Sequence, residues 1–323
     1  MLRFLRNLLQ GALLAAVAAA NALAGGAVLV VNSGGASLSV VDMASHREVR
    51  TIPVLREPHH VALTPDGRYL LVGDTVGNEL LVLDPQSFAL RRRVPVADPY
   101  QLGFSPDGRY LTVTGLARNQ VDIYDAATLT LAKRFPLKTM PSHLAYSPDA
   151  GRVFVTLQGT GRLAAIDLKA MKVLYETEVG KTPAGVLWLN GRVLVALMGE
   201  DGLAVVNPDT GRVERRVVTG RGAHQLFLSR DKTTLWVNNR VEGTTVALDP
   251  ATLAVKRSYK VPGGPDDIDF APDGKLWITQ RFAHSVAVLD PSSGALDSIP
   301  VGRSPHGVFI SPNAKPDAQV SAR

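Results

Sequence analysis

Histidines gather at two neighbouring positions of a sequence pattern that recurs along the chain. Five of the seven histidines fall at these positions: His59, His60, His143, His224 and His306. Imidazole groups exchange protons near neutral pH, donate and accept hydrogen bonds, and bind transition metals. A recurring position that brings several of them together is therefore the first candidate for chemistry in this sequence.

Other polar residues belong to the same set. Two carboxylates occupy the histidine positions in one copy of the pattern, and amide and guanidinium groups follow the next apolar run in two copies. The ligand-binding candidates are therefore His59, His60, His224, Asn239, Arg240, Asp266, Asp267, Gln280, Arg281 and His306. Apolar residues hold the corresponding places elsewhere, at Leu157, Ala184, Leu197 and Met198. An opening with one polar arc and one apolar arc would suit a ligand pocket.

Several kinds of chemistry fit these residues. Imidazoles with Asp266 and Asp267 could hold Zn or Cu. One histidine could be the axial ligand of a haem whose propionates pair with Arg240 or Arg281. Hydrolysis, for instance of a lactone, would need a base, an acid and an oxyanion stabiliser, and Asp266, His224 and Arg281 could be arranged so. Alternatively, the histidines only hydrogen-bond the backbone of neighbouring loops. The sequence contains no phosphate-binding Gly-rich loop, His-Glu-x-x-His or nucleophile-elbow motif.

The elements that must position these side chains are visible in residues 58–84, PHHVALTPDGRYLLVGDTVGNELLVLD. Short apolar runs at 61–63, 70–72 and 80–83 predict three strands, and 90–96 predicts a fourth, more polar one. Between the first two, Pro65-Asp66-Gly67 predicts a tight turn, because proline presets φ and glycine supplies a positive φ. Four short strands in about forty residues are typical of a propeller blade.

The number of blades follows from the residue expected to end each third strand. These residues are Asp42, Asp84, Asp125, Asp167, Asn207, Asp249 and Asp290, 40 to 42 residues apart. The sequence therefore predicts an all-β fold, a seven-bladed β-propeller of four-stranded antiparallel blades. In such a ring the ends of the second strands and the starts of the first strands lie on one face, around the mouth of the central channel.

The two ends of the repeat region are incomplete blades that complement each other. Residues 27–54 supply second, third and fourth strands, whereas 305–312 supply a first strand with nothing after it. We expect the ring to close when the C-terminal strand pairs with the N-terminal three, which leaves no open sheet edge. The single propeller domain then covers residues 25–312, and 313–323 are expected to be a flexible tail.

The N-terminal segment is predicted to be separate from the ring. Arg3 and Arg6 precede an apolar run, and Ala22-Leu23-Ala24 matches a signal-peptidase site before Gly25. We therefore expect residues 1–24 to be a signal peptide, the mature protein to be periplasmic or secreted, and no membrane span to remain after cleavage.

Composition narrows the function classes further. The chain has no cysteine, which rules out disulfides, thiol nucleophiles, iron–sulfur clusters and covalent Cys-x-x-Cys-His haem. The formal charge is +6, two charges of which belong to Arg3 and Arg6, and the remaining charges are interspersed. A nucleic-acid partner is therefore not expected.

Two stretches carry a resemblance to a known family. Residues 104–113, FSPDGRYLTV, and 305–312, PHGVFISP, resemble the repeat of YVTN-type β-propellers, which include YncE-like periplasmic proteins. The resemblance covers about residues 27–312. Similar rings occur in haem-d-type nitrite reductases, amine dehydrogenases, propeller lactonases and nitrous oxide reductase. No catalytic motif of these proteins can be matched residue by residue here, so the resemblance implies a fold and no active site.

The sequence therefore predicts an exported binding or scaffold protein that engages a small ligand or a partner protein at the channel-mouth face. The alternative is a periplasmic enzyme or a protein that handles a cofactor or metal, namely haem, Cu or Zn, or hydrolyses a lactone. Cofactor content, catalytic residues and metal ligands stay open at this point.

Overall fold

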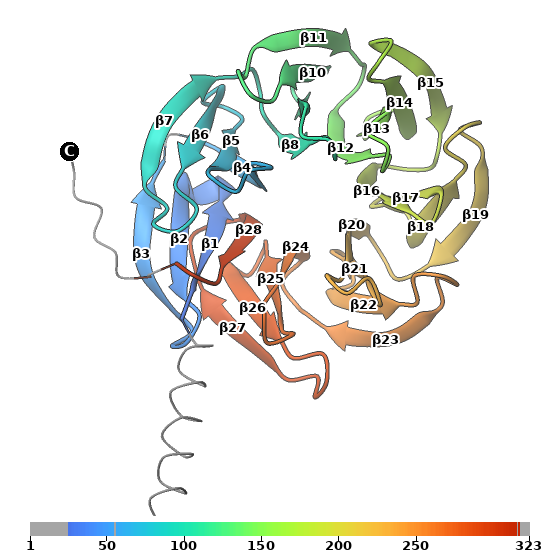
Figure 1. Ribbon diagram of the computed structural model, residues 1–323. Coiled ribbons are helices and arrows are strands. Elements are labelled where there is room, and N and C mark those ends of the chain that lie inside the picture. The colour runs from blue at the N-terminus through green and yellow to red at the C-terminus, as the bar shows by residue number, and fades with distance from the viewer. Residues whose placement is uncertain (1–24, 55, 315, 317–323) are drawn as a thin grey trace, which may run out of the picture.

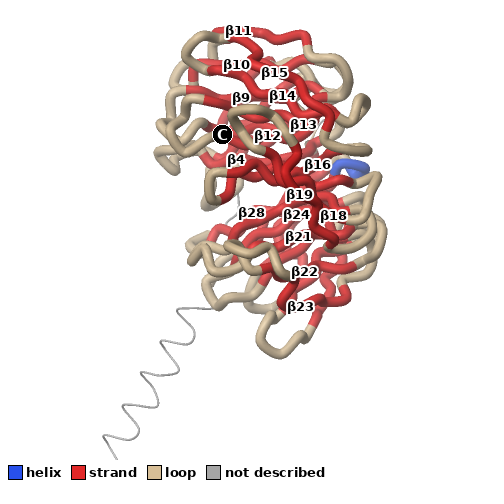
Figure 2. Tube along the Cα trace, turned by 90° about the vertical axis from the view of Figure 1, so that its right-hand side faces the viewer, coloured by secondary structure: helices blue, strands red, loops and turns tan. Residues whose placement is uncertain are grey.

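The computed structural model describes residues 25–54, 56–314 and 316. They form seven four-stranded antiparallel sheets arranged around a central channel (Figure 1). The predicted seven-bladed propeller is confirmed. Figure 2 shows the ring from the side, with loops gathered at its two faces. The expected signal peptide, residues 1–24, lies outside the described residues, and so does most of the expected tail, although Ala314 is buried against the closing blade.

One blade joins the two ends of the chain, as expected. Its sheet has the order β28-β1-β2-β3, in which Ala27 pairs with Ser311. The strands are β1 (Ala27–Asn32), β2 (Ser37–Asp42), β3 (Arg47–Pro53) and β28 (Pro305–Ser311), and a 3-10 turn, η1 (Ser33–Gly35), follows β1. The edge of β1 is thereby paired with the last strand of the chain.

The other six blades each come from one continuous stretch of chain. The next two contain β4 (Pro58–Leu63), β5 (Leu70–Asp74), β6 (Glu79–Leu83) and β7 (Leu90–Pro95), then β8 (Gln101–Phe104), β9 (Tyr110–Gly115), β10 (Gln120–Asp125) and β11 (Leu131–Pro136). The following two contain β12 (Pro141–Tyr146), β13 (Arg152–Leu157), β14 (Arg162–Asp167) and β15 (Lys172–Glu178), then β16 (Pro183–Leu189), β17 (Arg192–Leu197), β18 (Gly202–Val206) and β19 (Val213–Val218). The last two contain β20 (Ala223–Leu228), β21 (Leu235–Asn239), β22 (Thr244–Leu248) and β23 (Val255–Lys260), then β24 (Pro265–Phe270), β25 (Leu276–Gln280), β26 (Ser285–Leu289) and β27 (Leu296–Pro300).

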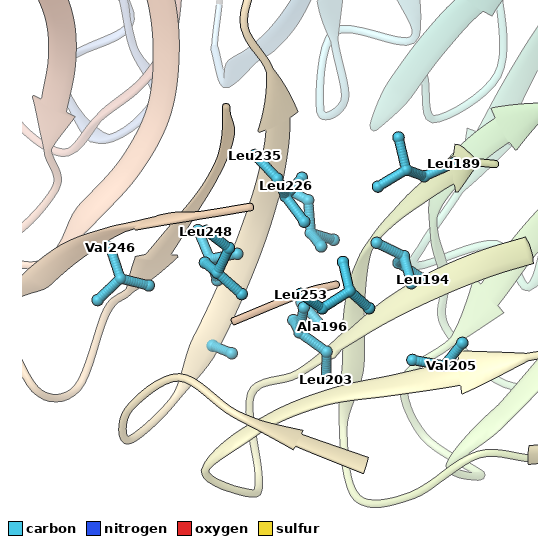
Figure 3. Packing of buried hydrophobic residues seen from close by; sticks show 12 residues of the cluster. Leu189, Leu194, Ala196, Leu203, Val205, Leu226, Leu235, Val246, Leu248 and Leu253 are labelled. Carbon is cyan, nitrogen blue, oxygen red and sulfur yellow. The ribbon is translucent and has the colours of Figure 1, made fainter. Parts of the chain in front are cut away.

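The core lies between blades. Seven apolar clusters fill the described ring, and one of them joins Leu194 and Leu203 of one blade to Leu235 and Leu248 of the next (Figure 3). Middle strands are covered on both faces, so β5 is buried throughout, whereas the outer strand β15 alternates between exposed and half-buried residues. A single blade cannot bury both faces of its sheet, and the ring depends on every neighbour.

The repeated Asp or Asn at the end of each third strand shapes the turn that follows. Asp84 Oδ1 accepts hydrogen bonds from the backbone N–H groups of Gln86 and Ser87, and Asn207 Oδ1 does the same for Asp209 and Thr210. This side-chain turn favours Asp or Asn. It explains why the spacing of these residues counts the blades.

Hydrogen bonds also link neighbouring blades near the channel. Thr279 in β25 donates to the carbonyl oxygen of His306 at 2.9 Å, and Thr156 in β13 donates to that of Ala184 at 2.8 Å. Each bond runs from a second strand to the first strand of the next blade.

None of the described residues forms a helix long and apolar enough to cross a membrane.

Candidate functional site

The innermost strands of the ring carry the predicted histidines into the channel mouth. Strands β4, β12, β20, β24 and β28 surround the centre of the ring (Figure 1). Their rim ends contribute buried imidazoles and one buried carboxylate: His59, His60, His143, His224, Asp266 and His306. With Arg240, Arg281 and Tyr100, these side chains form a group that we call the mouth cluster.

Irregular pairing explains how two consecutive histidines join one cluster. Successive side chains of a regular strand point to opposite faces. The pairing of β4 with β5 shifts register between Pro58 and Val61, and that of β24 with β25 shifts between Pro265 and Ile268. Such irregularities re-aim side chains. As a result the His59 and His60 rings lie only 5.4 Å apart, measured between centroids.

Asp266 is the centre of the mouth cluster. Its Oδ1 lies 2.7 Å from His224 Nδ1 and contacts Arg240, whereas its Oδ2 lies 2.6 Å from His306 Nδ1 and 3.4 Å from Arg281 Nη1. Two imidazoles and two guanidiniums from four other strand ends or loops thus converge on one carboxylate. The three residues considered for hydrolysis all meet here, with His224 and Asp266 both buried.

Electrostatics keep this carboxylate ionised despite its burial. Burial alone would raise the pKa of Asp266, but Arg240, His306 and His224 hold that pKa well below its usual range. The adjacent carboxyl behaves oppositely, because burial and the charge of Asp266 raise the pKa of Asp267 well above its usual range. Their surroundings thus shift the pKa values of these two consecutive carboxyl groups in opposite directions.

Around Asp266 the imidazoles contact one another directly. His306 Nε2 lies 3.1 Å from His60 Nε2, and the His59 ring packs 4.0 Å from the His306 ring and 4.2 Å from Tyr100. His143 continues the chain of rings, 5.4 Å from His60 and 5.3 Å from His224. The pKa of each of the five imidazoles is lowered, with burial as the largest cause, and that of His306 falls to about 4. These rings are therefore neutral at neutral pH.

Two members of the cluster were not among the ligand-binding candidates. His143 occupies the second histidine position and Tyr100 the first, in blades whose remaining rim residues are less polar. Burial raises the pKa of Tyr100 to about 12, so its phenol stays protonated. His143 was among the aligned histidines, and Tyr100 follows Pro99 in the same register as His59 follows Pro58, so the shared register is the signal that places both.

Three candidates lie outside the cluster. Asn239 donates to the carbonyl oxygen of Thr219, and Gln280 donates to that of Pro262, so both brace the loop that enters their own blade. Asp267 accepts a hydrogen bond from the backbone N–H of Val308 in β28. The side chains of Asn239, Gln280 and Asp267 thus make backbone contacts that hold the rim together.

A cavity opens beside the cluster. Its volume is about 280 Å³, and it lies between the β4–β7 and β8–β11 blades. His59 and Tyr100 line it together with Glu57, Thr75, Val76, Asn78, Asp98, Leu116, Ala117 and Arg118. His59 is therefore shared between the cavity and the buried imidazoles.

The arrangement does not fit a haem. An axial histidine must present a free ring nitrogen to the face of a macrocycle, yet all five imidazoles of the cluster are at least 96% buried against neighbouring side chains. Arg240 and Arg281, considered as partners of propionates, are both drawn to Asp266.

A family model for YNCE-like beta-propellers matches residues 4–315, nearly the whole chain. The chain belongs to the YNCE-like β-propeller family. None of the curated proteins matches this YNCE-like chain. The family and the fold are thus established together, in agreement with the resemblance seen in the repeats.

Solved structures extend the likeness to diverse proteins. A functionally unknown protein from Desulfotomaculum acetoxidans has a TM-score of 0.72 at 14% identity and covers 91% of this chain and 100% of that one. Dihydro-heme d1 dehydrogenase NirN, solved in complex with DHE, has a TM-score of 0.65 at 15% identity, covering 89% and 75%. Virginiamycin B lyase from Staphylococcus aureus has a TM-score of 0.66 at 16% identity, covering 79% and 91%. At these identities the likeness shows the fold alone.

Proposed function

We propose that this YNCE-like propeller is an exported binding protein that holds a small molecule in the cavity beside His59. The observation that carries the proposal is the shared position of His59, which lines the cavity and also packs against the buried histidines. A small molecule in the cavity would thus contact a residue of the mouth cluster directly. The periplasm or the extracellular space is the proposed location, because of the predicted signal peptide.

The lining of the cavity indicates the ligand's chemistry. Val76, Leu116 and the Tyr100 ring offer apolar contacts, whereas Glu57 and Asp98 offer carboxylates. Burial raises the pKa of Asp98, although the backbone N–H of Arg118 donates to it at 2.8 Å. Small pockets that combine apolar walls with a few polar groups select ligands of matching pattern. We therefore expect a small molecule with an apolar ring or chain and an amine or hydroxyl donor.

A blocking substitution tests this function. Ala117 lies on the exposed rim of the cavity, so Ala117→Trp should fill it without disturbing the core. The matched control is Val241→Trp, at the corresponding rim position of another blade and 62% exposed. A panel of small amines, amino alcohols and aromatic alcohols would be screened by thermal shift. At least one should stabilise the parent and Val241→Trp but not Ala117→Trp; equal stabilisation of all three, or none, would contradict the proposal.

A partner protein is the second candidate, favoured by the exposed apolar side chains of the same face. Val218, Phe282 and Val241 are 76%, 64% and 62% exposed, and all three lie at strand ends or loops of the channel-mouth face. Exposed apolar groups gathered on one face are typical of protein-binding surfaces. A Phe282→Ser/Val241→Ser variant should lose a co-purifying partner if this function holds, while Ala117→Trp should keep it.

A further inference from the structure

Three imidazoles between β4 and β28, those of His59, His60 and His306, lie close enough together to share one ion. We propose that His59, His60 and His306 bind one transition-metal ion, copper or zinc, at the inner end of the channel mouth. The proposal does not depend on the small molecule proposed above. It rests on the geometry of the three rings, on the group that orients His306, and on an unpartnered nitrogen.

The distances suit a shared ion. One ligand nitrogen from each of the three residues lies within 4.8 Å of the others, and the two Nε2 atoms of His60 and His306 are 3.1 Å apart. Two imidazole nitrogens that bind one tetrahedral ion at about 2.0–2.1 Å are separated by roughly 3.4 Å. The observed pair therefore needs to move apart by only a few tenths of an ångström to bind an ion.

The orientation of His306 favours a role as a metal ligand. Its Nδ1 lies 2.6 Å from Asp266 Oδ2 and also 2.6 Å from Arg281 Nη1. The Asp266 oxygen lies at hydrogen-bond distance and also pairs with Arg281, so we assign the ring hydrogen to Nδ1, where it is donated to the carboxylate. The Nε2 lone pair then faces His60. Carboxylates commonly hold metal-binding histidines in this way, and they raise the basicity of the ligating nitrogen.

A buried nitrogen of His59 that lacks a hydrogen-bond partner is an independent indication of a bound ion. The side chain is 4% exposed, and its buried Nδ1 has no hydrogen-bond partner within the described part of the chain. Leaving a buried polar atom unsatisfied is unfavourable by roughly 1–3 kcal/mol. An ion bound to Nδ1 would remove that penalty. The other ring nitrogen of His59, Nε2, is the alternative ligand atom.

Charge and protonation select the type of ion. All three rings are buried, and each imidazole offers a nitrogen ligand to the shared position. Three neutral nitrogen ligands are preferred by copper and zinc over magnesium or calcium, which take oxygen ligands. Among these ions Cu⁺ adds the least charge beside Arg240 and Arg281. Tyr100 stays protonated, so a fourth position would be left for water or for a ligand in the cavity.

Metal binding is tested with the metals alone. The full chain, stripped with a chelator, would be titrated with Zn²⁺ and, under reducing conditions, with Cu⁺, and bound metal counted after desalting. We expect one equivalent of at least one of the two metals per chain. His60→Ala and His306→Ala should each weaken that binding by about 100-fold or more. Loss of a residue that only supports a ligand weakens binding by about 10–100-fold, and loss of the ligand itself should be at least as severe.

Controls keep the test decisive. His284→Ala removes an exposed histidine that lies outside the mouth cluster, and this variant should keep one equivalent. If a triad variant fails to fold, X-ray absorption of the loaded parent decides, since three histidine nitrogens at about 2.0 Å are expected. No metal retained by the folded parent, or binding unchanged in both triad variants, would overturn the site. Either result would leave the Ala117→Trp experiment unaffected.

Discussion

The hydroxyl of Thr279 donates a hydrogen bond to the backbone carbonyl of His306, at 2.9 Å and across the boundary between two blades. Equivalent bonds run from Thr114 to Ser142 and from Asn238 to the carbonyl of Asp266. The residues that accept these bonds stand at the histidine positions. The same backbone that joins the blades therefore also fixes the origin of the Asp266 and His306 side chains in the mouth cluster.

Thr279→Val should weaken the ring and loosen His306. The substitution keeps the shape of the side chain but leaves the buried carbonyl without this donor, so we expect the free energy of unfolding to fall by about 1–2 kcal/mol. Urea denaturation measures it. Thr177→Val, on the half-buried face of the outer strand β15, is the control and should change stability by less than about 0.5 kcal/mol. Equal effects of the two substitutions would show that the interblade bond contributes nothing specific.

Asp266→Asn should be far more damaging than other single changes at the rim. It leaves Arg240 and Arg281 without their shared carboxylate in a buried setting. Breaking such a network at one member is unfavourable by about 3–5 kcal/mol. Adding Arg240→Met should restore part of the loss, because one uncompensated charge is removed. Chemical denaturation of the two single variants and the double variant gives the coupling; strictly additive losses would argue against a network centred on Asp266.

Acid should remove the stabilisation that Asp84 gives its turn. Burial alone would raise the pKa of Asp84, but Arg91 and the backbone N–H of Ser87 lower it to about 2 from 3.8. A carboxyl whose folded pKa is lowered stabilises fully above its unfolded pKa and loses that effect as pH falls through the folded value. The contribution should therefore disappear between about pH 4 and pH 2.

Asp84→Asn isolates that charge. Asparagine keeps the oxygen that accepts the turn's backbone N–H groups, as Asn207 does in its own blade, but it cannot titrate. The variant should melt below the parent at pH 7 and converge with it near pH 2. A difference in melting temperature that stays constant over this range would mean that the ion pair with Arg91 does not contribute.

Removing residues 305–323 should unfold the whole ring. The deletion takes away β28, which pairs with β1 and places Val308 and Ile310 in a cluster with Trp277 of the preceding blade. Far-UV circular dichroism and thermal melting would show loss of cooperative unfolding. Removing only 317–323 is the control and should leave the melting temperature unchanged. A deletion of 305–323 that melts like the parent would contradict closure by the two chain ends.

The repeat determined most of the architecture in advance. The regular spacing of Asp84 and its equivalents predicted the number of blades, since each such residue is required by a turn at a fixed place in the unit. The complementary strands at the two ends predicted the closing sheet. These features depend on local turn chemistry and on strand counting, both of which are expressed in residue types.

The site was harder to predict, because it depends on where side chains turn after the strands have paired. Aligned positions gave Asn239 and Gln280 the same weight as Arg240 and Arg281, yet the first two bond to loop carbonyls and the last two reach Asp266. The register shifts that bring His59 and His60 to one side have no residue signature of their own. A sequence pattern could thus place groups on one rim without showing which of them meet.

The pairing of Ala27 with Ser311 also determines when the ring can close during biosynthesis. The strands β1, β2 and β3 must wait, with one edge of β1 unpaired, until the chain from Pro53 to Pro305 has been synthesised. Contacts so distant along the chain form late, because a very large loop has to close. A nascent chain that stalls anywhere before its final strand would carry an exposed β1 edge, and such a product would be open to aggregation and to proteases.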